Sequence, residues 1–215
     1  MPGNTPTRAG MAPSAAHRVP GLHVTTEPKN LIRVCWGEVG PRDAAYHDEE
    51  WGRPCHDDQQ LFERLMLECF QAGLSWSLIL ARRETFALAF DGWDAARIAQ
   101  YGDEDVARLM SDPGIIRNRL KVNGAVKNAR GFLRLQAEHG TFDRYIWAFA
   151  PPSKQAPPSF GEVPSTTPES DAMSKALRKE GFTFVGSTIC YAFMQSVGMV
   201  NDHLAGCPAR AQIGD

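Results

Sequence analysis

The sequence predicts a mainly α fold built as a bundle of short helices. Short apolar stretches recur at helical spacing through most of the chain, as Leu61, Leu65 and Cys69 illustrate. An acidic residue, Ser or Thr precedes most of these stretches, which is typical of a helix N-terminus. The alternation that predicts a strand is absent except over residues 182–185. With 215 residues, 43% of them apolar, the chain can bury one substantial core.

We expect a disordered tail over residues 1–30 and one ordered domain over residues 31–215. The first 30 residues are rich in Pro, Gly, Ala, Thr and Ser and lack periodicity. No apolar run approaches the roughly 20 residues that span a bilayer, and the N-terminus lacks the pattern of a secretory signal. We therefore expect a soluble cytoplasmic protein that does not bind membranes. Five scattered cysteines indicate thiols or metal ligands rather than disulfides.

The first half of the domain divides into short helices. Residues 43–52 indicate turns and one short helix. The next helix covers residues 58–72, with Asp57 or Asp58 as its N-cap and Gly73 as its stop. Another helix starts near Ser75, and three more are predicted over residues 84–90, 94–100 and 103–110, each opened by an acidic residue.

The second half begins with a break at residues 112–114, Asp-Pro-Gly, after which a helical pattern resumes over residues 121–138. A tight hairpin between two helices is thus predicted near residues 103–138. A short helix follows over residues 142–149, then a Pro- and Ser-rich loop over 151–168. Thr167 and Pro168 start a helix that Gly181 ends, and residues 188–197 form a buried helix.

Glu68 is the one carboxylate in the mostly apolar stretch 67–76, which ends in Trp76. It lies three residues after Leu65, at the edge of an apolar helical stripe. A carboxylate at the rim of a core has a pKa set by burial and by its hydrogen-bond partners, which makes it a candidate for chemistry. A salt bridge or a capping role would explain it equally simply.

The predicted hairpin is basic. Residues 113–135 contain six basic residues and no acidic ones. Gly114 permits a tight turn, and free N–H groups at the start of the following helix can bind a phosphate. Gly114, Arg117, Arg119 and Lys121 are therefore candidates for sequence-independent DNA binding. The net charge of −2 argues against a surface that is basic throughout, and an ordinary solvated face would also explain these residues.

Two Cys–His pairs lie near the two ends of the ordered chain. Cys35 and His47 precede the predicted core helices, whereas His203 and Cys207 follow them, four residues apart. Two thiolates with two imidazoles match a closed tetrahedral zinc site, which stabilises structure and leaves no position for catalysis. Spacing alone leaves Cys55 and His56 as competing ligands, and unrelated core residues as the alternative. Cys69 and Cys190 lie in apolar runs typical of a core.

Several motifs together resemble one family. They are Tyr-His-Asp-Glu-Glu-Trp-Gly at 46–52, Gln-Ala-Gly-Leu-Ser-Trp at 71–76, Gly-Ile-Ile-Arg at 114–117, Phe-Val-Gly-Ser-Thr-Ile-Cys-Tyr at 184–191 and Val-Asn-Asp-His at 200–203. In this order, between Cys35 and Cys207, they resemble the constitutive bacterial 3-methyladenine DNA glycosylase I family. The resemblance implies a helix-hairpin-helix DNA glycosylase fold, with a structural Zn²⁺ joining the N- and C-terminal segments through Cys35, His47, His203 and Cys207.

The resemblance also implies a function in DNA base-excision repair. Tyr46 and Glu68 would hydrogen-bond an extruded 3-methyladenine while Trp76 stacks on it, and we assign Glu68 as the catalytic residue. Related helix-hairpin-helix enzymes use an Asp beyond the hairpin or a Lys nucleophile, which this family lacks. We therefore expect monofunctional hydrolysis of the N-glycosidic bond, without lyase activity, by a monomer acting on double-stranded DNA with alkylated bases.

Two departures from the family pattern concern the pocket. Asp43 stands where members usually carry a Tyr, and the spacing from Cys35 to Tyr46 is one residue short. Trp36 is a candidate replacement for that aromatic wall, and Trp51 is expected to pack in the core. Two rival functions remain open at this point: a non-catalytic helix-hairpin-helix module that only binds DNA, and a zinc hydrolase, which would need an open metal site.

Overall fold

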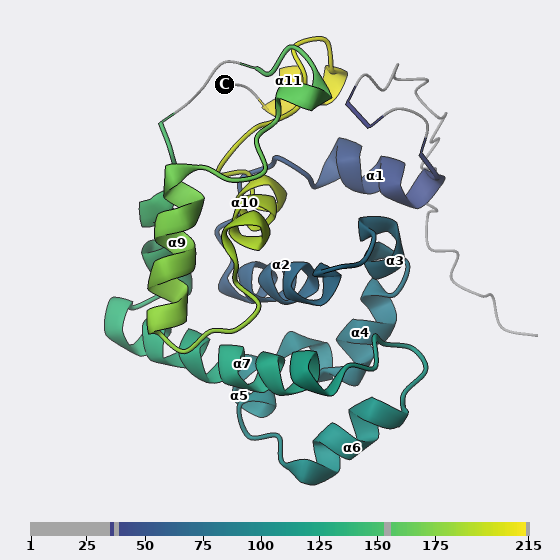
Figure 1. Cartoon of the computed structure of the whole chain (residues 1–215), viewed down its shortest axis with the longest axis vertical. Coiled ribbons are helices and arrows are strands. Elements are labelled where there is room, and N and C mark those ends of the chain that lie inside the picture. The colour runs from purple at the N-terminus through teal and green to yellow at the C-terminus, as the bar shows by residue number, and fades with distance from the viewer. Residues whose placement is uncertain (1–34, 37–38, 153–155, 214–215) are drawn as a thin grey trace, which may run out of the picture. The chain divides into compact units, whose positions relative to one another are not determined.

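Helix α2 (Asp58–Gln71) is the central helix of the core. The computed structural model describes residues 35–36, 39–152 and 156–213, so the predicted tail over residues 1–30 lies outside the described residues. α2 packs against α3 (Trp76–Leu80), α7 (Arg119–His139), α8 (Phe142–Ile146) and α10 (Ser187–Ser196) (Figure 1). It is held at its start by Asp57, which accepts a hydrogen bond from the Gln60 N–H at 2.9 Å.

The predicted hairpin joins α6 (Asp103–Ser111) to α7, the long helix that crosses below α2 in Figure 1. α7 also packs on α5 (Ala95–Ile98). Before α5 the chain forms α4 (Arg83–Ala89) and a short 3₁₀ turn, η1 (Asp91–Trp93). Two helices joined by a short turn thus lie near residues 103–138, and the second of them starts two residues earlier than the apolar pattern indicated.

The two ends of the described chain meet. α1 (Pro41–Glu49) packs on α11 (Pro208–Ile213), which lies beside it in Figure 1. α11 was not predicted, although a Pro at the first helical position was available as a signal. After α7, α8 continues directly into η2 (Trp147–Phe149). The predicted loop over residues 151–168 contains one short 3₁₀ turn, η3 (Phe160–Glu162). It leads to α9 (Pro168–Lys179), which packs on α10.

The possible strand at residues 182–185 is not formed, and the described part of the chain contains no strand. Phe184 has a φ of +59°, which interrupts an extended conformation. The Asn128 side chain instead satisfies this backbone, because Oδ1 accepts from the Thr183 N–H at 2.7 Å and Nδ2 donates to the Thr183 carbonyl at 3.1 Å. A buried amide on α7 thus takes the place of a partner strand.

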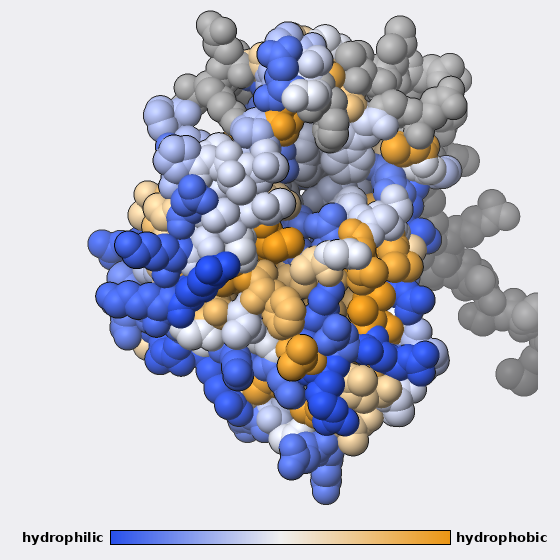
Figure 2. Space-filling model, in the orientation of Figure 1, coloured by the Kyte–Doolittle hydropathy of each residue, from blue (hydrophilic) through white to orange (hydrophobic). Residues whose placement is uncertain are grey.

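The surface seen in Figure 2 is divided. Hydrophilic residues gather on the left of the view, over the lower end of α9, while apolar residues gather over α2, α3 and α4. Leu74, in the turn after α2, and Leu88, on α4, are 37% and 83% exposed. None of the described helices combines the length and the apolar character needed to cross a membrane.

Candidate functional site

A pocket of about 450 Å³ opens between α1, α2, α3 and α10. Its volume is within the usual range for small-molecule sites. Glu68 comes from α2, Tyr46 from α1 and Trp76 from α3, so the fold brings together the three predicted base-binding residues. The full lining consists of Cys35, Trp36, Val39, Asp43, Tyr46, Trp51, Glu68, Gln71, Trp76, Ser77, Ala192 and Gln195.

Aromatic rings form much of the pocket wall. The ring centroids of Tyr46 and Trp76 are 5.0 Å apart, and those of Trp36 and Tyr46 are 6.0 Å apart. Trp36 therefore contributes an aromatic face, as the sequence suggested it could. Trp51 is buried, as expected, but also lines the pocket. Such a group of rings suits a flat, cationic ligand, which gains stacking and cation–π attraction.

Glu68 is 4% exposed, and its Oε2 atom has no hydrogen-bond partner among the described residues. Burial raises the pKa of Glu68 to about 8. Buried polar atoms are nearly always paired, so an unpaired carboxylate oxygen beside a cavity indicates that a ligand completes its bonding. The salt bridge or cap that could have explained Glu68 is not found in the described part of the chain.

Tyr46 and Trp76 add two further polar groups to the pocket lining. Burial, followed by the nearby charge of Glu68, raises the pKa of Tyr46 well above its ordinary value, so its hydroxyl stays a hydrogen-bond donor. The indole Nε1 of Trp76 is buried, with no acceptor within the residues that the structure describes. The pocket thus presents donors, an acceptor and ring faces to a single ligand.

Four polar residues of the lining are not among the predicted base-binding residues: Asp43, Gln71, Ser77 and Gln195. Asp43 does not leave a gap, because its carboxylate accepts a hydrogen bond from the Ser77 hydroxyl and so ties α1 to α3. Gln195 donates from Nε2 to Asp202 Oδ2 at 3.0 Å. A lone amide in the apolar helix α10 was a signal of the same kind as Glu68. Gln71 carried no such signal, because it lies at a helix end.

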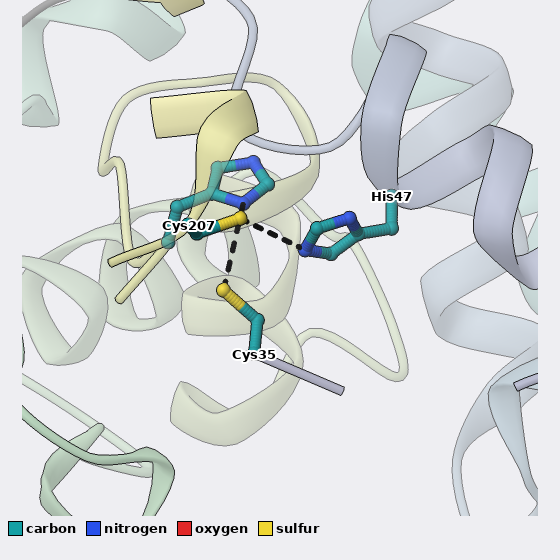
Figure 3. Close-up of side chains that lie close together, drawn as sticks. Cys35, His47 and Cys207 are labelled. Atoms are coloured by element: carbon teal, nitrogen blue, oxygen red, sulfur yellow. Dashed lines mark hydrogen bonds between the residues drawn. The ribbon is translucent and has the colours of Figure 1, made fainter. Parts of the chain in front are cut away.

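The four predicted metal ligands also meet. The ligand atoms of Cys35, His47, His203 and Cys207 all lie within 4.8 Å of one another, and all four residues are buried. Figure 3 shows Cys35, His47 and Cys207 pointing toward one another. Cys207 Sγ lies 3.5 Å from His203 Nδ1 and 3.8 Å from His47 Nε2. Ligands about 2.0–2.3 Å from a tetrahedral ion would be separated by about 3.3–3.8 Å, so the cluster could hold a metal ion.

Hydrogen bonds outside the cluster orient both imidazoles. His47 Nδ1 lies 2.7 Å from Asp48 Oδ1, which leaves Nε2 facing Cys207. His203 Nε2 lies 3.0 Å from the Trp51 carbonyl oxygen, which leaves Nδ1 facing the two thiols. Burial lowers the pKa of His203 to about 4, so its imidazole is neutral. Such outer partners are typical of histidines that ligate metals.

The competing ligands lie elsewhere. His56 Nδ1 is 2.8 Å from Asp143 Oδ1, and its ring stacks on Trp147. Cys55 Sγ lies 3.8 Å from the side-chain oxygen Oε1 of Gln60. The structure thus selects Cys35 and His47 over Cys55 and His56, a choice that spacing could not make.

The hairpin differs in detail from the prediction. The backbone N–H groups of Leu120 and Lys121 donate to Asn118 Oδ1, and the Gly114 N–H donates to Asp112 Oδ1 at 2.7 Å. These amides are therefore not free to bind a phosphate. A Cβ at Gly114 would lie 3.0 Å from the Thr85 Cβ, so glycine here permits close packing on α4. Arg117 and Arg119 are exposed.

Lys121 requires a correction. Its ammonium donates to the carbonyl oxygens of Phe70 and Ala72, each at 2.7 Å, and the residue is only 7% exposed. An ammonium buried between two carbonyls at the end of α2 does not contact a phosphate. This placement does not support the predicted DNA contact of Lys121, because the basic run 113–135 contains one residue that faces the core.

Comparison with known proteins identifies the family of the chain. The family model described as methyladenine glycosylase matches residues 36–211, most of the chain. The DNA-3-methyladenine glycosylase 1 of Escherichia coli is 45% identical over 179 residues, which cover 82% of this chain and 96% of the relative.

Solved structures give the same result. The 3-methyladenine DNA glycosylase I of Staphylococcus aureus, described with its recognition of 3-methyladenine, matches with a TM-score of 0.80 and 30% identity over 83% of this chain and 96% of its own. A variant of 3-methyladenine DNA glycosylase I in complex with 3-methyladenine also has a TM-score of 0.80 and 30% identity, covering 83% of this chain and 97% of its own.

Proposed function

The chain belongs to the methyladenine glycosylase family, and from this premise we propose how its pocket works. The protein is a DNA-3-methyladenine glycosylase of base-excision repair, acting on alkylated DNA. The observation that carries the assignment of the site is Glu68, which lies buried beside Tyr46 and Trp76 with one oxygen unpaired among the described residues. The rival non-catalytic DNA-binding module leaves this pocket unexplained.

The substrate base must leave the duplex to reach the pocket, which costs least for a damaged, weakly paired base. 3-Methyladenine in DNA is cationic. Trp76 and Tyr46 hold its ring by stacking and cation–π attraction, and Glu68 accepts a hydrogen bond from its amino group. The cation favours the ionised carboxylate and so opposes the effect of burial on the pKa of Glu68.

The reaction is hydrolysis of the N-glycosidic bond. The bond between C1′ and the purine nitrogen breaks, its electron pair goes to the purine, and the base leaves as a neutral molecule. The oxygen of water then bonds to C1′ and loses a proton to solvent, which leaves an abasic site. No lysine is among the residues found to line the pocket, so strand cleavage through an amine adduct is not expected.

The Cys35, His47, His203 and Cys207 cluster is proposed to hold one Zn²⁺. Two thiolates and two neutral imidazoles, each imidazole oriented by an outer partner, suit this ion. Four protein ligands close the site, so zinc would act structurally, by joining α1 to the segment before α11. This argues against the zinc-hydrolase alternative. We further propose a monomer, since one chain supplies the whole pocket and the whole cluster.

The base-release assay tests the proposed function. We expect the protein to release 3-methyladenine from methylated DNA at least 100-fold faster than 7-methylguanine. Both bases are cationic, so charge does not separate them. Glu68 can accept from the adenine amino group, but it would face the carbonyl oxygen of guanine. Comparable release of both bases would contradict this assignment of the pocket, and binding without any release would support the non-catalytic module.

Arg117 and Arg119 are proposed to contact DNA phosphates, because both are exposed at the hairpin. Replacing both with Ala should weaken binding to all sequences and reduce the slope of log affinity against log salt by about 2. The exposed Lys175 on α9 provides a control, and Lys175→Ala should leave the slope unchanged. If the double variant keeps the wild-type slope, these arginines belong to a solvated face.

A further inference from the structure

The hairpin is attached to both ends of the segment that carries Trp76. At the start of this segment, Lys121 Nζ donates to the carbonyl oxygens of Phe70 and Ala72. At its end, Arg82 Nη1 donates to the carbonyl oxygens of Pro113 and Ile115, at 2.8 and 3.3 Å. The hairpin, which is proposed to contact DNA, and the segment that carries Trp76, which is proposed to bind the base, therefore share four charge-assisted hydrogen bonds.

The end of α2 needs such a partner. The last carbonyl groups of a helix lack intrahelical donors and carry partial negative charge, so a cation there is stabilising. After α2, Ala72 leaves the helical region with a ψ of 111°, and the Leu74 N–H donates to the Gln71 carbonyl oxygen at 2.6 Å rather than to that of Phe70. Among the described residues no backbone N–H is found on the carbonyl oxygens of Phe70 and Ala72. Lys121 supplies the donor for both of these carbonyl oxygens. Its ammonium is buried, which is costly unless its hydrogen bonds are retained.

This turn sets the geometry of the pocket. Glu68 lies two residues before Phe70 on the same helix, and Gln71 lines the pocket. After the turn, Ser75 accepts a hydrogen bond from the Leu78 N–H and starts α3, whose first residue is Trp76. A shift of the turn would therefore move the carboxylate and the indole relative to each other.

We propose that Lys121 is a positioning residue for base excision: it fixes the turn between α2 and α3, and so links the hairpin that binds DNA to the placement of Glu68 and Trp76. This inference rests on the proposed function. It assigns Lys121 neither a phosphate contact nor a contact with the base, since Lys121 is buried and does not line the pocket.

Lys121→Met tests the proposal, because it keeps an unbranched side chain and removes both hydrogen bonds. Lys121→Arg retains a cation that can donate to two carbonyls, and Lys127→Met is a control at an exposed position of the same helix. Three quantities are measured: affinity for free 3-methyladenine by calorimetry, the single-turnover rate on methylated DNA, and affinity for undamaged duplex as a function of salt. Hydrogen exchange of the amides of residues 71–76 is followed without substrate.

For Lys121→Met we expect free-base affinity and single-turnover rate to fall ~10- to 100-fold, as small misplacements of binding groups do. Exchange at residues 71–76 should accelerate, and the salt slope should stay at the wild-type value. Lys121→Arg should recover most of the loss, and Lys127→Met should bind the free base normally. A slope reduced by about 1 with normal base affinity would overturn the proposal and identify a phosphate contact.

Two further outcomes are decisive. If Lys121→Met does not fold, Lys121→Gln, which keeps a neutral donor, is measured in the same way; loss of folding in both variants would mean a purely structural role and would overturn the proposal. A wild-type protein that releases no 3-methyladenine would contradict the proposed function. The role of Lys121 is tested independently by hydrogen exchange, because unchanged exchange at residues 71–76 in Lys121→Met would contradict the positioning role.

Discussion

Glu68→Gln should lower the single-turnover rate of 3-methyladenine release by roughly 100-fold, comparable to the loss of one preorganised polar group in other active sites. The substitution keeps the size of the side chain and replaces an acceptor-only carboxylate with an amide. Hydrogen bonds to a charged group are about twice as strong as neutral ones, and the amide also loses the attraction to a cationic purine. The measurement is release of free base from methylated DNA with enzyme in excess.

Glu63→Gln is the matched control. Glu63 lies on the same helix, but its carboxylate pairs with Arg83 at 2.9 Å and does not line the pocket. This variant should excise the base at close to the wild-type rate. Equal rates for wild type, Glu68→Gln and Glu68→Ala would remove Glu68 from the mechanism.

Stability provides a second readout for the same substitution. The pKa of Glu68 is raised in the folded state to about 8 from an ordinary value of 4.5. The protonated form is thus favoured on folding, and the wild-type protein loses stability as pH rises from about 4.5 through 8. Gln does not titrate, so Glu68→Gln should be more stable than wild type at pH 8, by on the order of 1–3 kcal/mol, and this gain should shrink toward pH 5. Thermal unfolding across this range would show it.

Local signals made much of the fold predictable. Asp57, Ser75 and Thr167 each accept a hydrogen bond from the backbone N–H three residues later, so the sequence alone marks these helix starts. Glu68 could be singled out for a similar reason, since a carboxylate in an apolar stripe is visible without knowledge of the fold.

Contacts between distant segments were not predictable in this way. Lys121 is a basic residue like its exposed neighbours in the run 113–135. Its buried partners are the carbonyl oxygens of Phe70 and Ala72, which lie 51 and 49 residues earlier in the chain and which only the fold brings near it. Likewise, the choice of Cys35 over Cys55 depends on which thiol meets His203, 168 residues away. Motif order supplied this information through the family resemblance, whereas spacing did not.

Removal of one metal ligand should affect both stability and the pocket. The cluster joins the residues around Cys35 and α1 to the segment that precedes α11, and it lies apart from the main hydrophobic core. Metal binding is coupled to folding, so Cys207→Ser should lose the bound ion and lower the melting temperature by roughly 10 °C, equivalent to a few kcal/mol. The main core should stay folded, because it is built from other helices.

The same variant should also bind the base less tightly, because His47 is adjacent to Tyr46 on α1 and Cys35 itself lines the pocket. Cys55→Ser is the matched control, since Cys55 is also buried but lies outside the cluster. Elemental analysis should find one zinc per chain in the wild type and in Cys55→Ser, and little in Cys207→Ser. A wild-type protein that contains no metal and melts at the same temperature as Cys207→Ser would show that the four residues are packed without an ion. The placement of α1 would then depend on other contacts, such as the hydrogen bond between Asp43 and Ser77 and the packing of α1 on α11.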